Sequence, residues 1–119
     1  MLVVLLFCIA AVVASPAQTF TTLLSFNGND GAGPEAVLQG INGNFYGTTL
    51  TGGINNNGTI FEITPAGKLT SLYRFCSQPN CTDGVGPQGG LVQATNGNFY
   101  GTTFSGEAHD SGVVFEITP

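Results

Sequence analysis

Charged side chains are scarce in this sequence, and positively charged ones are the scarcest. The 119 residues include seven Asp and Glu but only two basic side chains, Lys68 and Arg74, which gives a net charge of −5. Because proteins contact phosphate mainly through Lys and Arg, this composition argues against nucleic acid as a partner. Gly, Asn and Thr take the place of the missing charges, and no segment has the capping and spacing of a long helix. The composition predicts a turn-rich, all-β protein.

Histidine is almost absent as well, which narrows the possible chemistry. His109 is the only imidazole, and nucleophilic catalysis requires a Ser, Cys or Thr beside a positioned base. His109 lies in the polar loop Glu107–Asp110, where we expect it to be solvated rather than to act as a ligand or base. The sequence therefore predicts no catalytic residues, no metal site and no cofactor.

No apolar run is long enough to span a bilayer, which takes about 20 residues. The run from Leu2 to Val13 is followed by the small residues Ala14 to Ala17. This is the pattern of a secretory signal with its cleavage zone, although no Lys or Arg precedes the run. We expect residues 1–17 to be a signal helix cleaved after Ala17, or after Ala14 as the alternative. The protein would then be secreted or cell-surface, without a membrane span in the mature chain; a buried N-terminal helix is the competing interpretation.

The rest of the sequence contains one pattern twice. The octapeptide Asn42–Thr49 returns letter for letter as Asn96–Thr103, 54 positions later, and Phe61–Pro65 returns at the same offset as Phe115–Pro119. A repeat of this length points to stacked supersecondary units, each unable to bury its own apolar faces. The two expected units are residues 18–65 and 66–119.

The cysteines that follow the signal lie where the two copies differ in length. Cys8 belongs to the apolar run and would leave with it, whereas Cys76 and Cys81 fall in a segment that is longer in the second copy. A bridge between them would close a short loop and stabilise the fold by roughly 2 kcal/mol in the chain-entropy model. We predict this disulfide; two unpaired thiols or half of a metal site are the alternatives.

Each copy divides into four short runs rich in Phe, Tyr, Val, Ile and Thr, of ordinary strand length. The expected strands are 20–26, 36–40, 44–50 and 59–64 in the first copy and 68–75, 90–95, 98–104 and 112–118 in the second. Four antiparallel strands in roughly 40–55 residues describe a β-propeller blade. The predicted fold is all-β, with two four-stranded antiparallel propeller-like blades of an incomplete propeller. A solenoid of stacked sheets and an eight-stranded sandwich are the alternatives.

Turn and glycine residues recur at fixed places between and within these runs. Asn42-Gly43 and Asn96-Gly97 each separate two strands, and Asn-Gly suits the two successive positive φ values of a type I′ hairpin. Pro65-Ala66-Gly67 predicts a turn between the two copies. Gly47 and Gly101 fall inside the third strand of each copy, where glycine normally weakens a sheet. We expect a bulge there, or the close approach of a neighbouring backbone.

Acidic residues also recur. Glu62 and Glu116 are equivalent residues of the fourth strand, and Asp30 and Asp83 are equivalent loop residues. Paired acids serve glycoside cleavage when they are suitably spaced. Residues that return in every unit more often serve the repeat, so we expect the Asp side chains to bond nearby backbone amides and the Glu side chains to face solvent.

Two further ligand sites are weaker alternatives. The segment Asn27–Gly31 superficially resembles a calcium loop but lacks the regular Asp spacing and the terminal Glu. A weak Ca²⁺ site is therefore the alternative to a turn. The aromatic pairs Phe45-Tyr46 and Phe99-Tyr100 are expected in the core rather than as stacking surfaces for a sugar.

The motifs together resemble a known repeat. Asn-Gly-Asn-Phe-Tyr-Gly-Thr-Thr, a glycine-rich loop, Gly-Thr-Ile-Phe-Glu-Ile-Thr-Pro and Leu-x-x-Leu-Tyr-x-Phe are similar to the GloVer (Gloeo/Verruco) tandem repeat, from about Leu23 to the last residue. The resemblance implies an exported bacterial protein with many propeller-like copies, often with a separate surface anchor, and it implies no catalytic residues. Propellers close with roughly 4–8 blades. Two copies therefore imply a fragment of a longer chain, or several chains assembled into one ring.

These features predict a non-catalytic binding or scaffold module of an exported surface protein. Its partners would be neighbouring repeats or other copies of the chain, with a glycan or protein ligand left open. The alternatives are part of a carbohydrate-active propeller enzyme and a truncated gene product without a function of its own.

Overall fold

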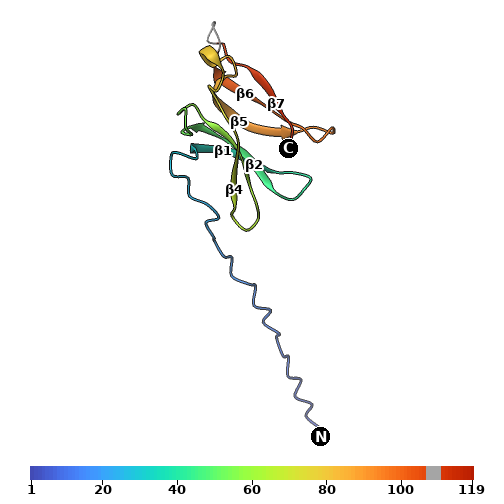
Figure 1. Ribbon diagram of the computed structural model, residues 1–119. Coiled ribbons are helices and arrows are strands. Elements are labelled where there is room, and N and C mark those ends of the chain that lie inside the picture. Colours follow the sequence, from blue (N-terminus) through green and yellow to red (C-terminus); the bar gives the residue numbers. More distant parts are fainter. Residues whose placement is uncertain (107–110) are drawn as a thin grey trace.

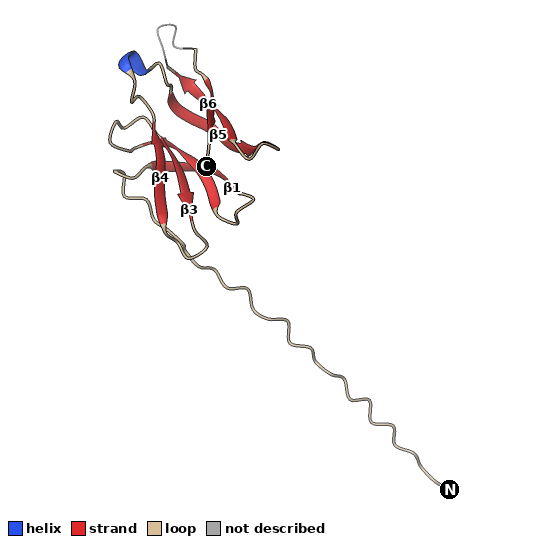
Figure 2. Cartoon of the chain, turned by 45° about the vertical axis from the view of Figure 1, so that its right-hand side comes forward, coloured by secondary structure: helices blue, strands red, loops and turns tan. Residues whose placement is uncertain are grey.

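The protein consists of two packed antiparallel sheets and a long extended N-terminal segment (Figure 1). The computed structural model describes residues 1–106 and 111–119. The first sheet contains, in spatial order, β1 (Ala32–Gln39), β2 (Phe45–Thr51), β3 (Thr59–Ile63) and β4 (Leu69–Arg74). The second contains β5 (Val85–Gln93), β6 (Phe99–Ser105) and β7 (Val114–Ile117). Among the described residues the only helix is the short 3₁₀ helix η1 (Pro79–Cys81), which lies in the connection between the sheets (Figure 2).

The sheets are offset by one strand from the expected units. β4 belongs to the second copy of the sequence, yet it pairs with β3 and completes the first sheet. The turn at Pro65–Gly67 makes β3 and β4 a hairpin, and a hairpin partner is the nearest antiparallel neighbour that a strand can find. The turn therefore lies within a sheet.

The same offset explains two wrong predictions. Residues 20–26, the counterpart of β4 in the first copy, form no strand. In the described part of the chain the second sheet therefore has three strands rather than the expected four. The first run of the second copy is the outer strand of the first sheet. Within the described residues, neither the second sheet nor the first run of the first copy has the corresponding strand partner.

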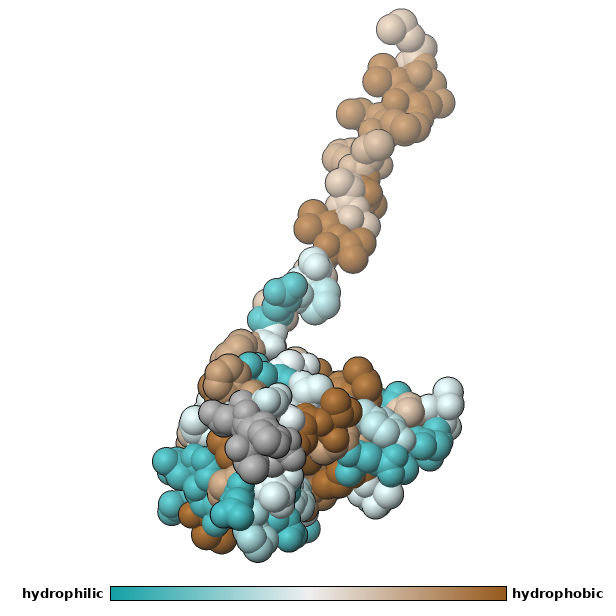
Figure 3. Space-filling model, turned by 90° about the horizontal axis from the view of Figure 1, so that it is seen from above, coloured by the Kyte–Doolittle hydropathy of each residue, from teal (hydrophilic) through white to brown (hydrophobic). Residues whose placement is uncertain are grey.

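Residues 1–26 form neither helix nor strand, so the expected signal helix and the competing buried helix are both missing. The apolar side chains between Leu2 and Val13 are exposed, from Val3 at 73% to Leu2 at 92%. Figure 3 shows them as an apolar tail that projects from the sheets. This segment contributes nothing to the core.

The core lies between the two sheets and is largely aromatic. Its buried residues are Tyr46, Ile60, Phe75, Leu91 and Phe99. The rings of Tyr46 and Phe99 lie against each other with centroids 4.2 Å apart. Phe75, which follows β4, packs edge-on against Phe115 of β7 at 5.2 Å. Such pairs contribute about 0.5–1.5 kcal/mol each beyond the area that they bury.

The Asn-Gly hairpins use a different turn from the expected one. Only the glycine of each pair has a positive φ, 88° at Gly43 and 86° at Gly97, whereas a type I′ turn needs two such residues. The N–H of Gly43 donates to the carbonyl of Gly40 at 2.9 Å, which is the pattern of a three-residue loop with a glycine bulge. In this loop Asn42 Oδ1 is placed to accept the N–H of Asn44 at 3.1 Å. The hairpin was predicted correctly and its turn type was not.

Glycine is required in β2 and β6 because an aromatic ring lies over it. A Cβ atom on Gly47 would lie 2.7 Å from Cζ of Phe61, its cross-strand partner, and one on Gly101 would meet the equivalent ring in the second sheet. The expected close approach of a neighbouring backbone also occurs at Gly47, where a Cβ would lie 3.1 Å from the carbonyl oxygen of Ala36 in β1, and it occurs again at Gly90. A Cβ there would lie 3.1 Å from the carbonyl oxygen of Ala36 in the other sheet.

We expect Gly47→Ala to destabilise the fold, because the new methyl group meets the Phe61 ring. Overpacking of this kind costs about 1–3 kcal/mol, which urea unfolding followed by circular dichroism would measure. The same substitution in a Phe61→Leu background should cost less, since the ring edge is gone. Equal costs in the two backgrounds would show that the ring is not the reason for the glycine.

Candidate functional site

The polar residues that recur in each hairpin meet in one hydrogen-bonded link. Tyr46 on β2 lies opposite Glu62 on β3, and its hydroxyl donates to Glu62 Oε2 at 2.6 Å. Asn42 Nδ2, from the turn before β2, donates to the same hydroxyl at 2.8 Å. Tyr46 is 1% exposed, and this burial, together with the hydrogen bond to Glu62, raises the pKa of Tyr46. The hydroxyl therefore stays protonated and joins the turn to β3.

The second sheet repeats the link with the same spacing. Asn96 Nδ2 donates to the Tyr100 hydroxyl at 3.0 Å, and that hydroxyl donates to Glu116 on β7. Tyr100 is half-buried and Glu116 is exposed, because no described part of the chain covers this face of the second sheet. Each unit is hereafter called the Asn–Tyr–Glu link.

Sequence reasoning treated the members of this link separately and so missed it. Asn42 was assigned to the turn, Tyr46 to the core and Glu62 to solvent. The last of these was wrong, because Glu62 is half-buried and accepts the Tyr46 hydroxyl. The separations of 4 and 16 residues, identical in both copies, were the available signal. If residues at those separations are taken to be neighbours across a hairpin, they predict the contacts of the tyrosine with the asparagine and the glutamate.

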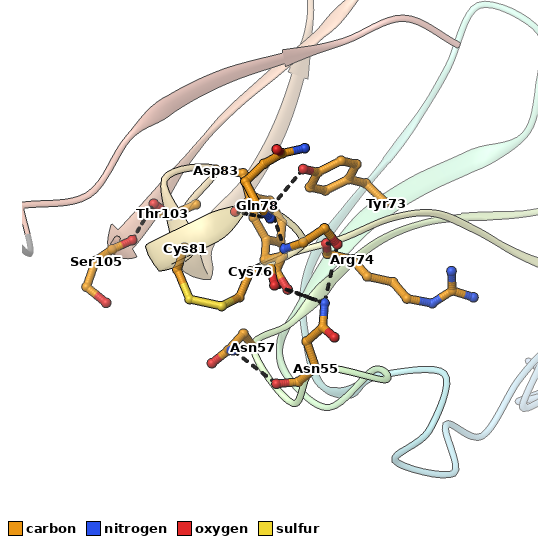
Figure 4. Close-up of a disulfide and its surroundings, with 12 residues drawn as sticks. Asn55, Asn57, Tyr73, Arg74, Cys76, Gln78, Cys81, Asp83, Thr103 and Ser105 are labelled. Carbon is orange, nitrogen blue, oxygen red and sulfur yellow. Dashed lines mark hydrogen bonds between the residues drawn. A yellow bond between two sulfur atoms is a disulfide. The ribbon is translucent and has the colours of Figure 1, made fainter. Parts of the chain in front are cut away.

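The loop between β4 and β5 contains the predicted disulfide between Cys76 and Cys81 (Figure 4). Asn55, in the loop between β2 and β3, connects the β4–β5 loop to the first sheet by hydrogen bonds. Its Nδ2 donates to the carbonyls of Phe75 at 3.1 Å and Cys76 at 3.2 Å. Disulfides persist in oxidising compartments, so the bridge fits an extracellular protein. Across residues 1–106 and 111–119, no helix is both long enough and apolar enough to span a membrane.

Asp83 organises the same loop through its carboxylate (Figure 4). Oδ2 accepts the Tyr73 hydroxyl and the Ser77 N–H, both at 2.8 Å, and Oδ1 accepts the Gln78 N–H at 3.2 Å. Burial alone would raise the pKa of Asp83, but these hydrogen bonds outweigh it and lower the pKa. Burial and the Asp83 carboxylate raise the pKa of Tyr73 to about 12. The carboxylate is therefore an ionised structural acceptor.

Asp30 has the corresponding role in the first copy. Its Oδ1 accepts the Asn27 N–H at 2.9 Å, while Asn27 Oδ1 accepts the N–H groups of Asn29 and Asp30 at 2.9 and 3.1 Å. The expectation that both aspartates bond nearby amides is confirmed. Within residues 1–106 and 111–119 no three His, Cys, Asp or Glu side chains gather as a metal site requires. His109 lies outside the described residues.

A cleft of about 390 Å³ opens along β7, between the two sheets. Its lining is mainly apolar, with two carboxylates, Asp83 and Glu116. The apolar side chains that line it are Ile60, Tyr73, Phe75, Val113, Val114, Phe115 and Ile117. In the first sheet the corresponding position, beside β3, is occupied by β4.

We expect Tyr46→Phe to lower the free energy of unfolding by roughly 1–2 kcal/mol, because it leaves Glu62 and Asn42 without their shared partner. Tyr100→Phe is the matched control, and its more exposed link should cost less since water replaces the hydroxyl. Denaturant unfolding of both variants measures the difference. Equal losses would indicate that burial does not set the strength of the link.

The pH dependence of stability tests the role of Asp83. Its pKa is lowered in the folded state from the usual 3.8, so its contribution is present above that pH and is lost as the pH falls through the folded value. We expect Asp83→Asn to cost roughly 1–3 kcal/mol at neutral pH and progressively less below pH 4. Asp30→Asn should cost less, because one amide oxygen can still accept the single bond from Asn27. If the loss of stability in Asp83→Asn does not change with pH, the Asp83 carboxylate is not an ionised hydrogen-bond acceptor.

Comparison with known proteins gives one family. The sequence profile of the Gloeobacter/Verrucomicrobia repeat matches residues 11–119, a range that includes both sheets and the disulfide loop. Neither the curated proteins nor the solved structures gave a match.

Proposed function

Because the chain belongs to the Gloeobacter/Verrucomicrobia repeat family, we propose that it is a non-catalytic scaffold module of an exported, β-propeller-like protein. The observation that carries this proposal is the Asn–Tyr–Glu link, which uses the same three residue types at the same spacing in both sheets. Each glutamate accepts a hydrogen bond from the tyrosine of its own sheet. The recurring polar residues thus serve the hairpin of each unit.

The strand order supports the propeller-like part of the proposal. In both sheets consecutive strands are neighbours and antiparallel, as in a propeller blade. The first sheet is apolar on both faces, with Tyr46 and Ile60 toward the second sheet and Phe45 and Phe61 on the other side. Such a sheet needs a neighbour on each face.

Export is supported by two independent features. The apolar segment 2–13 stays outside the folded part of the chain, as expected of a leader that is removed. The disulfide between Cys76 and Cys81 suits an oxidising compartment.

The cleft along β7 favours carbohydrate binding or cleavage as a second candidate function. Asp83 and Glu116 line it together with the aromatic ring of Tyr73, and paired acids beside an aromatic side chain suit a sugar. Asp83, however, is held ionised by three hydrogen bonds, whereas glycoside cleavage needs one acid with a raised pKa. Scaffolding is therefore the better-supported function.

One preparation tests both parts of the proposal. The full-length chain is produced in a secreting bacterium, and intact mass should show a product that begins at Gln18. We expect this product to hydrolyse no member of a polysaccharide panel. If the product hydrolyses a polysaccharide, and this activity is lost in Glu116→Gln but kept in Glu62→Gln, the protein is an enzyme rather than a scaffold. A product that retains residues 1–17 inside the cell would contradict export.

A further inference from the structure

The second sheet has an unfilled position at the edge of β7. In the first sheet β4 runs beside β3, with Tyr73 opposite Ile60. Within the described residues no strand pairs with the outer edge of β7, and the cleft of about 390 Å³ lies there. An unpaired strand edge is a template for another strand.

Residues 20–26 have the sequence of the strand that belongs at this position. Thr21-Thr-Leu-Leu-Ser-Phe26 corresponds to Thr70-Ser-Leu-Tyr-Arg-Phe75, which contains most of β4 and the phenylalanine after it. In the structure this segment forms no strand, and Phe20 is 94% exposed. A β-prone segment without a strand partner therefore accompanies a sheet that lacks a strand.

The end of this segment is already packed as the end of β4 is. The ring of Phe26 lies edge-on to Phe61 with centroids 5.1 Å apart. The equivalent ring after β4, that of Phe75, lies edge-on to Phe115 at 5.2 Å. Phe75 joins the outer strand of the first sheet to the face of the second. Phe26 therefore lies against the first sheet as Phe75, the residue after an outer strand, lies against the second.

The outward faces of the two sheets match the faces already in contact. The second sheet packs on the first through Leu91, Phe99 and Phe115. Their equivalents in the first sheet, Val37, Phe45 and Phe61, line an open groove, which Leu23, Leu24 and Phe26 also border. In the other direction, the first sheet packs on the second through Leu38, Tyr46 and Ile60. Their equivalents in the second sheet line an open pocket: Val92, Tyr100 and Val114.

We infer that two copies of this chain associate head to tail, and that residues 20–26 of one copy form the fourth strand of the second sheet of the other. The inference rests on the proposed scaffold function and names the partner that completes it. The open groove of one copy covers the open pocket of the next, so the contact between sheets inside the chain is repeated between chains.

The register of this added strand follows from that of β3 and β4. Thr59 pairs with Arg74 and Ile60 pairs with Tyr73, so the equivalent pairs between copies are Val113 with Ser25 and Val114 with Leu24. Phe20 falls opposite Ile117, as Leu69 does opposite Ile63. Directly opposed residues share a face of the sheet, so Phe20 lies on the face of Phe115 and Ile117 and fills the cleft beside them.

The contact is heterologous, because one copy contributes the groove of its first sheet and the other contributes the pocket of its second sheet. Such contacts close into a ring when the rotation between copies allows it and otherwise extend as a filament. With two sheets per copy, a ring of about 2–4 copies has the roughly 4–8 blades of a propeller.

Cysteine cross-linking between two variants tests the register. Full-length Ser25→Cys and Val113→Cys are each made with Cys8→Ser, so that the introduced thiol is the only unpaired cysteine beside the Cys76–Cys81 bridge. Mild oxidation of the mixture should give a dimer with one chain of each variant, identified by mass spectrometry of the linked peptides. Thr95→Cys, at an exposed turn of the second sheet, replaces Val113→Cys in the control. Cross-linking no greater than in that control would overturn the inference.

The oligomeric state provides a second measurement. Light scattering after size-exclusion chromatography should show dimers or larger assemblies for the wild type and monomers for Val114→Lys. Val114 is 79% exposed in the single chain, so the variant should keep the wild-type circular dichroism. Ile54→Lys, at a loop residue that is 76% exposed, should assemble as the wild type does. A monomeric wild type would overturn this inference. It would not affect the scaffold proposal, which is tested separately by the hydrolysis and export measurements.

Discussion

The whole structure depends on contact between sheets that are apolar on both faces. Tyr46 and Ile60 point one way from the first sheet, and Phe45 and Phe61 point the other. One sheet of four short strands cannot bury both sets of side chains by itself, and the hydrophobic core of the described residues lies between the two sheets. Stacking is therefore the condition for folding, and the tight turns, the glycines and the offset of the repeat all serve it.

Polar groups at this contact are tolerated because each has a partner within its own sheet. A buried tyrosine hydroxyl without partners would be costly. Here the Tyr46 hydroxyl both accepts from Asn42 and donates to Glu62. One aromatic residue thus gives its ring to the contact between sheets and its hydroxyl to the hairpin. This double use explains how so few charged residues suffice to fix the register of the strands.

Much of this fold was predictable from the sequence, and the reasons for the misses are physical. Strand positions followed from β-prone runs, and the disulfide from a pair of cysteines in one longer loop. The sheet to which each strand belongs did not follow from the sequence, because a sequence repeat has no intrinsic beginning. Only the hairpin at Pro65–Gly67 assigns β4 to the first sheet. The ring over Gly47 was missed because the pattern shows a glycine but not which side chain crosses it.

The offset between sequence copies and sheets decides how such a chain can be cut or lengthened. A fragment made at the copy boundaries, such as 66–119, would contain β4 without its partner β3. The natural unit for a protein engineer is residues 32–74, because it contains the four strands of the first sheet. In a longer array built from such units, each linker would pass from the outer strand of one sheet to the inner strand of the next, so neighbouring sheets would be covalently interlocked.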